Sequence, residues 1–240
     1  MTGPVLVCCS HGTGSPAGHA TVTAIVDEVR SALDVETYET YVDVQHPQID
    51  EVVGSLGGPA VIVPLLLSPG FHTAVDIGRA AASREGIVAT GTLGPHPLLV
   101  EALEERLERA GLRSGDRVVL AASGSSRPEA AARVEQVRAA LDERMAVPVT
   151  AGFAYGARPS VEMAVEEARA AGAARVVIAS YVLAPGHFAG LIAAAGADIV
   201  TDPLGVGRSG GADPRIVRIV LERYVRGAAE LARGVASRAP

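Results

Sequence analysis

The 240-residue sequence predicts an α/β protein made of two similar domains, each a parallel sheet flanked by helices, with a cleft between them. Three observations predict this fold. Short apolar runs alternate with longer amphipathic stretches, as in strands joined by crossover helices. The second half of the chain repeats motifs of the first. Trp is absent and aromatic residues are scarce, so the core must consist of Val, Leu, Ile and Ala, as in helix-covered parallel sheets.

Eight apolar runs have the length of strands, and helical periodicity separates most of them. The predicted strands are residues 5–9, 35–42, 60–67, 86–91, 117–122, 147–152, 175–182 and 197–200. The predicted helices include residues 20–33, 48–56, 98–110, 129–145, 161–171 and 214–232. Strands and helices that alternate in this way imply parallel strands with right-handed crossovers.

Three pairs of matching segments carry the internal repeat, in the same order and at a nearly constant offset. Residues 5–10 (VLVCCS) match 118–123 (VVLAAS), and residues 62–70 (IVPLLLSPG) match 178–186 (IASYVLAPG). His96-Pro97 and its helix match Asp213-Pro214 and its helix. We therefore expect domains at residues 1–112 and 113–240. The Gly-rich stretch 205–211 interrupts the second copy and is interpreted as a surface loop or a mobile lid.

Composition excludes several classes of protein. The net charge of −6 argues against a nucleic-acid partner, which requires a positive face. No apolar run is long enough to span a membrane and no secretory leader is recognisable, so we expect no membrane association. The two cysteines, Cys8 and Cys9, are adjacent on a predicted strand and point to opposite faces, which argues against a disulfide between them. We expect a cytoplasmic protein.

Polar side chains follow three predicted strands of the first half. His11 follows the first strand, Asp43 closes the second and His72 follows the third. The carboxyl ends of parallel strands meet at one edge of a sheet, where ligands bind. Two imidazoles and one carboxylate can hold a divalent first-row metal and leave positions open. The same groups can accept protons from a ligand.

The second half lacks this triad although it keeps the scaffold. This indicates that the first half carries the active site and that the second half encloses the cleft without taking part in the chemistry. The expected counterparts are Gly124 (or Ser125 after a shift of one) for His11, Tyr155 for Asp43, and Phe188 for His72, with His187 next to it. Of the remaining histidines, His19 is expected to be exposed and His96 to pack at a helix N-terminus, while His46 could cap the next helix or approach the cleft. Whether His46 and His96 contact substrate stays open.

Two enzyme classes with similar folds fit the motifs poorly. The loop from Gly12 to Gly18 reads G-x-G-x-x-x-G, which is one residue off the dinucleotide-binding fingerprint and carries a proline. A Ser/His hydrolase needs a G-x-S-x-G elbow, and none occurs.

Three motifs of the first 110 residues resemble those of the sirohydrochlorin chelatases, which belong to the class II tetrapyrrole chelatases. The motifs are His11-Gly12 after the first strand, Asp43-Val44-Gln45-His46-Pro47 after the second, and Gly70-Phe71-His72 with Asp76-Ile77 after the third. The resemblance implies two chelatase-like domains in the long form of the family, with His11, His72 and Asp43 as metal-binding and catalytic residues. The family usually has Gly-Ser after the first His and often Glu in place of Asp43, so the metal geometry is expected to differ.

The resemblance also implies the reaction and its partners. Sirohydrochlorin or a related tetrapyrrole would lie in the cleft and receive Fe2+, with Co2+ next and Ni2+ possible, for siroheme or cobalamin synthesis. No organic cofactor is expected, and no ATP, since no P-loop occurs. The alternative is a carrier of the same fold that binds and releases a tetrapyrrole or metal unchanged. A monomer or a homodimer fits this arrangement.

Substrate contacts are expected from both halves. Arg side chains and helix N-termini would meet the carboxylates of the ring. The expected contacts are Ser10, Ser125, Arg127 and His187, with Arg79 and Arg158 as further anchors.

Overall fold

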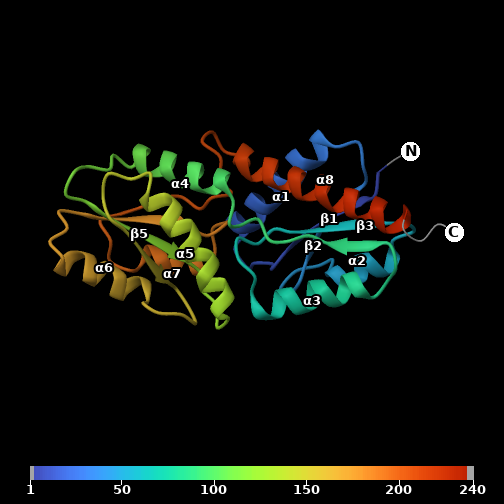
Figure 1. Ribbon diagram of the computed structural model, residues 1–240, viewed down its shortest axis with the longest axis horizontal. Helices are drawn as coiled ribbons and strands as arrows, with labels where there is room; N and C mark the ends of the chain where they lie inside the picture. Colours follow the sequence, from blue (N-terminus) through green and yellow to red (C-terminus); the bar gives the residue numbers. More distant parts are fainter. Residues whose placement is uncertain (1–2, 237–240) are drawn as a thin grey trace.

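The computed structural model describes residues 3–236, with the side chains of residues 71–74 and 235–236 excepted. These residues form eight strands and eight helices (Figure 1). The strands are β1 (Val5–Ser10), β2 (Thr37–Tyr41), β3 (Ala60–Pro64), β4 (Ile87–Ala89), β5 (Arg117–Ala122), β6 (Val149–Phe153), β7 (Val176–Tyr181) and β8 (Ile199–Val200). The helices are α1 (Pro16–Ala32), α2 (Ile49–Ser55), α3 (Phe71–Ala82), α4 (Pro97–Arg109), α5 (Pro128–Asp142), α6 (Val161–Ala170), α7 (His187–Ala193) and α8 (Pro214–Ala236).

The strands form two four-stranded parallel sheets with the same topology. The first sheet has the order β2-β1-β3-β4 and the second has the order β6-β5-β7-β8. The sheets lie toward opposite ends of the long axis of the molecule (Figure 1). Two similar parallel α/β units are therefore confirmed, as the repeat predicts.

The core of each sheet is aliphatic on both faces, as the composition requires. Leu6 and Cys8 of β1 belong to a buried cluster on one face, and Val7 and Cys9 belong to a cluster on the other. Both cysteines are free and fully buried, and burial raises the pKa of each thiol to about 12. They therefore stay protonated at neutral pH, although they directly precede the predicted site.

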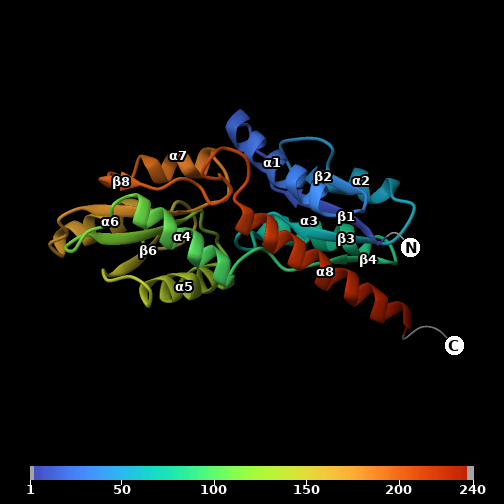
Figure 2. The same ribbon diagram turned by 90° about the horizontal axis from the view of Figure 1, so that it is seen from above.

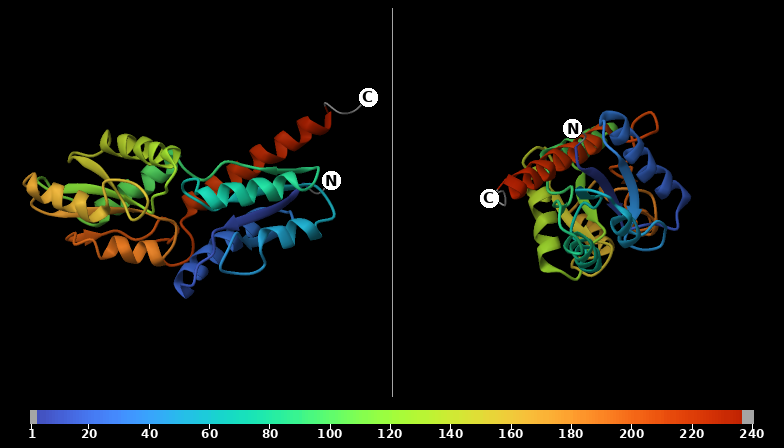
Figure 3. Two further views of the ribbon diagram at one scale, coloured as in Figure 1. Left: turned by 90° about the horizontal axis from the view of Figure 1, so that it is seen from below. Right: turned by 90° about the vertical axis from the view of Figure 1, so that its right-hand side faces the viewer.

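The two halves exchange their last helices. Helix α4 ends the first half of the chain but packs on β7 and α5 of the second sheet. Helix α8 ends the second half but packs on β3 and β4 of the first sheet and against α1. Figures 2 and 3 show α8, in red, running along the first sheet, away from the yellow and orange elements. The expected boundary at residue 112 stays a prediction, and the packing shows that each compact unit takes a helix from the other half.

A buried ion pair joins the two exchanged helices. Arg106 of α4 donates through Nη1 to Oδ2 of Asp213, at 3.1 Å, immediately before α8 begins. Its Nη2 also donates to the carbonyl oxygens of Leu204 and Val206. The side chains of Arg106 and Asp213 are 1% and 3% exposed. This pair fixes the point at which the chain crosses between the sheets.

Helices α3 and α7 are not among the helices that the sequence pattern predicts. Each follows the third strand of its sheet after a short Pro-Gly loop, and α7 has only seven residues rich in Ala and Gly. Such a composition gives little helical periodicity to recognise. Among the described helices, none combines the length and the apolar character needed to cross a bilayer.

Candidate metal-binding site

His11 and Asp43 lie side by side because the main-chain ladder between β1 and β2 continues past both strands. Val42 N donates to Ser10 O at 2.9 Å, and Asp43 N donates to His11 O at 3.0 Å. Both side chains are solvent-exposed. The strand pairing therefore presents an imidazole and a carboxylate together at the carboxyl edge of the first sheet, as the sequence predicts.

Gly12 makes this approach of the two loops possible. Its φ of +94° lies in the left-handed region, and a Cβ atom at this position would lie 2.0 Å from the carbonyl oxygen of Asp43. Any other residue would therefore clash with Asp43 and strain the backbone. Glycine after His11 is required by the geometry of the site as well as by the turn.

The carboxylate of Asp43 is held by its own loop. Its Oδ1 accepts a hydrogen bond from Val44 N at 2.7 Å, and its carbonyl oxygen accepts one from Gln45 N at 2.7 Å. Val44 itself has a φ of +67°, an uncommon conformation for a β-branched residue. The strained turn points one carboxylate oxygen at a backbone donor and leaves the other with its full acceptor capacity.

Gln45 is a positioning residue whose role the sequence motif alone does not reveal. Its Oε1 accepts a hydrogen bond from Thr13 N at 2.8 Å. This bond ties the loop after β2 to the loop after β1, two residues from His11. No local pattern signals it, because the partners are 32 residues apart.

His72 is the second residue of α3, which follows β3 in the same sheet. Its side chain lies outside the described residues, so two of the three predicted ligands are placed. Among the side chains that the structure describes, no group of three or more His, Cys, Asp or Glu residues is arranged to hold a metal ion. The triad of His11, Asp43 and His72 therefore stays a prediction.

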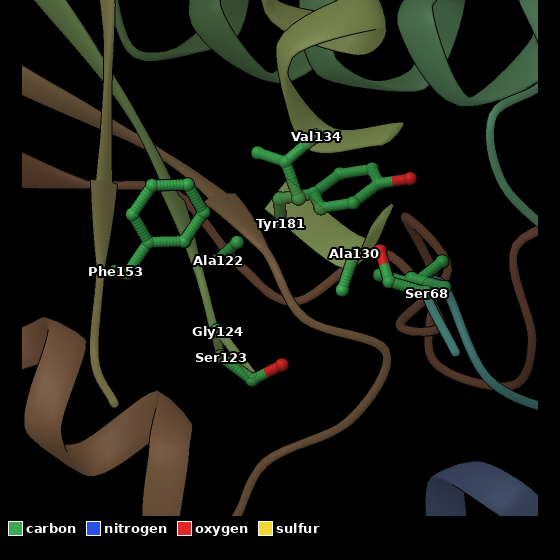
Figure 4. Close-up of a pocket in the computed structure, with 9 residues that line it drawn as sticks. Ser68, Ala122, Ser123, Gly124, Ala130, Val134, Phe153 and Tyr181 are labelled. Carbon is green, nitrogen blue, oxygen red and sulfur yellow. The ribbon is translucent and has the colours of Figure 1, made fainter. Parts of the chain in front are cut away.

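A small hollow lies where the segment after β3 meets the second half (Figure 4). Leu67 and Ser68, after β3, line it from the first half, and Ser123, Phe153 and Tyr181 are among the residues that line it from the second. Figure 4 shows Ser68 and Phe153 on opposite sides, with Tyr181 between them. The segment after β3 thus packs against the carboxyl ends of β5, β6 and β7.

The second half reproduces the scaffold of the site without its ligands. Ala154 N donates to Ala122 O at 2.9 Å, and a Cβ atom on Gly124 would lie 1.9 Å from the carbonyl oxygen of Tyr155. Gly124 is therefore the counterpart of Gly12, and Ser123 is the counterpart of His11. The expected match of His11 to Gly124 or Ser125 is wrong, because pairing the serines of the two strand motifs shifts the register by one residue. Tyr155 is the counterpart of Asp43, as the repeat predicts.

Ser125 and Arg127 lie at the start of α5, on the same side as Ser123. Ser125 Oγ accepts a hydrogen bond from Arg127 N at 3.2 Å, and Arg127 is the N-cap residue of the helix. The first half has the same turn, in which Thr13 Oγ1 accepts from Ser15 N at 3.1 Å. Both Ser125 and Arg127 are partly exposed near the hollow, and their contact with substrate stays a prediction.

His187 and Ser10 differ sharply in accessibility. His187 is exposed at the first turn of α7 and stacks edge-on against Phe188, with ring centroids 5.4 Å apart. The preceding Gly186 lies against the loop of His11, since a Cβ there would be 3.2 Å from Thr13 Oγ1. Ser10 is 4% exposed, and its Oγ is enclosed without a hydrogen-bond partner. Ser10 is therefore buried at the end of β1, and its contact with substrate stays a prediction.

Other candidates have partners of their own. Arg79 pairs with Asp50 at 2.8 Å and with Asp76 at 3.1 Å, so its charge is already neutralised. Arg158 is exposed and contacts the sulfur of Met163. His96 caps α4 by accepting from Leu98 N, as its position before Pro97 predicts. His46 pairs with Glu51.

Comparison with known proteins places the chain in a family. The family model described as CbiX matches residues 5–110 and, separately, residues 117–226. The chain belongs to the CbiX family. The two matched segments coincide with the two copies of the repeat. No curated protein matches the sequence.

Solved structures of chelatases share the fold over almost the whole chain. SirB from Bacillus subtilis with Fe3+ has a TM-score of 0.78 and 20% identity, covering 97% of this chain and 98% of that chain. The sirohydrochlorin chelatase SirB from Bacillus subtilis subspecies spizizenii, in complex with cobalt, has a TM-score of 0.73 and 18% identity, covering 97% of each chain.

A third structure extends the likeness to a member of the same family. CbiX, described as the terminal enzyme for biosynthesis of siroheme in denitrifying bacteria, has a TM-score of 0.61 and 19% identity, covering 91% of this chain and 98% of that chain. The resemblance to the sirohydrochlorin chelatases is thus confirmed for family and fold.

Proposed function

We propose that this protein is a sirohydrochlorin chelatase that inserts a divalent metal into its substrate without ATP. The observation that carries the proposal is the pairing of His11 with Asp43 at the carboxyl edge of the first sheet, with α3 delivering His72 from the next strand. The opposite half keeps the same turns but has Ser123 and Tyr155 at the matching positions. The first half would bind the metal and accept the protons, and the second half would enclose the substrate from the other side.

Metal insertion exchanges two protons for one metal ion. As the ion forms bonds to the ring nitrogens, two pyrrole N–H groups lose their protons. Neutral His11 and His72 can each accept one, and the carboxylate of Asp43 stabilises the imidazolium that forms beside it. Before this transfer the same residues would hold the incoming ion, because neutral imidazole and carboxylate are ligands for first-row metals. The imidazoles become free to accept the protons once the ion has moved to the ring nitrogens.

The face between the His11 loop and the starts of α5 and α7 is the proposed place of the ring, because Gly186 brings α7 against Thr13 of that loop. Ser125, Arg127 and His187 approach from the second half, where hydroxyl, guanidinium and imidazole groups suit the peripheral carboxylates. Backbone N–H groups at the start of α5 add donors. The substrate would then lie between its anchors in the second half and the metal ligands in the first.

Fe2+ is the proposed metal, with Co2+ next and Ni2+ also compatible with the ligands. Two imidazoles and one carboxylate suit all three ions, and availability decides between ions of similar affinity. One solved neighbour contains Fe3+ and another contains cobalt, which supports both siroheme and cobalamin synthesis as destinations. Both cysteines are free, in keeping with a reducing cytoplasm.

The test is anaerobic insertion of Fe2+ or Co2+ into sirohydrochlorin, followed by the visible absorption of the ring. His11→Ala and His72→Ala should each lower the enzyme-dependent rate by about a hundredfold, in the range lost with an acid–base group. His46→Ala is the control, because it removes an exposed histidine outside the site and should retain the wild-type rate.

Equal rates with and without the protein, despite tight binding of the ring, would contradict the proposal. That outcome would instead assign the protein to the carriers, which bind a tetrapyrrole or metal and release it unchanged.

A further inference from the structure

A second hollow lies beside α5 and has a different chemistry. It opens between α8, the helix α5 and the segment 90–95 that follows β4, and encloses about 670 Å3 including its open mouth. Arg133 of α5 and Arg223 and Arg226 of α8 line it, together with Glu230. It shares no lining residue with the hollow of Figure 4. We call it the arginine pocket.

The arginine pocket has an excess of positive charge. Three guanidinium groups face one carboxylate, that of Glu230. In the described part of the chain, none of the three arginines forms an ion pair, whereas Arg106, Arg175 and Arg215 each pair with an aspartate. Arg133 and Arg223 donate only to the main-chain oxygens of Gly94 and Leu93.

Arg223 has a strained electrostatic environment. Partial burial lowers the pKa of its guanidinium, and the charges of Arg226 and Arg133 lower it further against the opposing effect of Glu222. Its Nε atom is buried and has no hydrogen-bond partner. Like charges held together without a counter-charge destabilise a fold, so three guanidinium groups that line one hollow favour a bound anion.

We propose that the arginine pocket binds a small multivalent anion through carboxylate or phosphate oxygens. The planar guanidinium fork matches carboxylate and phosphate geometry, and an anion bound here would screen the three positive charges from one another. Such an anion would bridge α5 of the second sheet and the segment after β4 of the first.

The position of the pocket defines two sources for the anion. Gly94 separates the pocket from the hollow of Figure 4, since a Cβ there would lie 2.2 Å from Tyr181 Oη and 2.6 Å from Leu67 O. A peripheral carboxylate of a ring bound between the halves would have to pass this contact to enter the pocket, and this source rests on the proposed function. A free metabolite with two or more acidic groups is the other source and does not depend on that function.

The first experiment measures thermal unfolding of the full chain in low-salt buffer while citrate or inorganic phosphate is added. Potassium chloride at matched ionic strength is the reference. The midpoint of the wild-type protein should rise with citrate or phosphate. In Arg226→Gln and Arg133→Gln, the same rise in the midpoint should need about tenfold more citrate or phosphate, as expected for the loss of one charged hydrogen bond. Arg218→Gln is the matched control, since Arg218 is an exposed arginine on α8 outside the pocket.

A second titration identifies the source. Sirohydrochlorin without metal is titrated into the same four proteins and its absorption is followed. An affinity about tenfold weaker in Arg226→Gln and Arg133→Gln, with competition by citrate, would assign the pocket to a carboxylate of the ring. Unchanged ring affinity with a lost citrate or phosphate response would assign it to a free anion.

The proposal is overturned if both pocket variants match the wild-type protein in both titrations, or if Arg218→Gln loses as much as they do. Neither titration measures metal insertion. Failure of the chelatase proposal would therefore leave the result for the arginine pocket intact.

Discussion

Two glycines carry the geometry of the site and of its inactive copy. Gly12 and Gly124 have φ values of +94° and +82°, and each lies against the carbonyl oxygen that follows the second strand of its sheet. One turn presents His11 and Asp43, and the other presents Ser123 and Tyr155. The two turns have the same backbone conformation, but only the turn of the first half carries side chains that can bind a metal. The same substitution in each turn therefore separates an effect on the site from an effect on stability.

Gly12→Ala should impair metal insertion more than Gly124→Ala does. Both changes place a Cβ atom on a carbonyl oxygen and force a residue into the left-handed region, which costs about 1–2 kcal/mol of stability or more. Only Gly12→Ala displaces Asp43, and a shift of about 1 Å at a reacting group costs roughly a hundredfold in rate. Urea unfolding and the insertion assay measure the two effects. Equal losses of activity in the two variants would contradict this assignment.

At the scale of elements, the exchange of α4 and α8 depends on the buried pair of Arg106 and Asp213. Burial by itself would raise the pKa of Asp213, but hydrogen bonds from Arg215 and the charges of Arg215 and Arg106 hold it below its ordinary value of 3.8. A depressed pKa in the folded state contributes stability above the unfolded value. That contribution is lost as the pH falls through the lower, folded value.

Asp213→Asn should destabilise the protein at pH 7 by about 3–5 kcal/mol, because it leaves Arg106 as a buried cation without its partner. Its stability should also vary less between pH 5 and pH 2 than that of the wild-type protein. Urea unfolding at pH 7, 5, 4 and 3 measures both effects. Asp34→Asn, an exposed change, is the control and should follow the wild-type curve. A variant curve parallel to the wild type would show that the pair contributes nothing to acid stability.

At the scale of the whole molecule, the helix exchange makes the two sheets interdependent. The first sheet has its β3 and β4 face covered by α8, which begins more than 120 residues after β4 ends. The second sheet is covered by α4 from the first half. The hollow of Figure 4 and the arginine pocket both take residues from the two halves. The molecule should therefore unfold as one cooperative unit.

A fragment of residues 1–112 should fail to fold cooperatively, although it contains the whole first sheet. Without α8 the apolar face of β3, including Val61 and Val63, is exposed to water, and α4 has no sheet to cover. Far-UV circular dichroism during thermal unfolding should show a broad transition, whereas the full chain should show a single sharp one. A sharp transition of the fragment would establish residue 112 as a true domain boundary.

The sequence predicts much of this architecture because local patterns record burial. Alternating apolar runs identify the strands, and parallel strands bring their carboxyl ends together, so the pattern alone places His11 and Asp43 at one edge of a sheet. The repeat predicts two similar units. It misaligns the counterpart of His11 by one residue, because aligning Ser10 with Ser123 gives the wrong register, and only the glycine turns reveal the shift.

Only the tertiary structure decides which helix covers which sheet and which arginines line the arginine pocket. The amphipathic faces of α4 and α8 suit either sheet equally, so their exchange depends on the course of the chain and on the buried pair of Arg106 and Asp213. Arg133 and Arg223 are 90 residues apart in the printed sequence and meet only because α8 returns to the first sheet. Local periodicity fixes what a segment becomes, whereas contacts between distant segments fix where it lies.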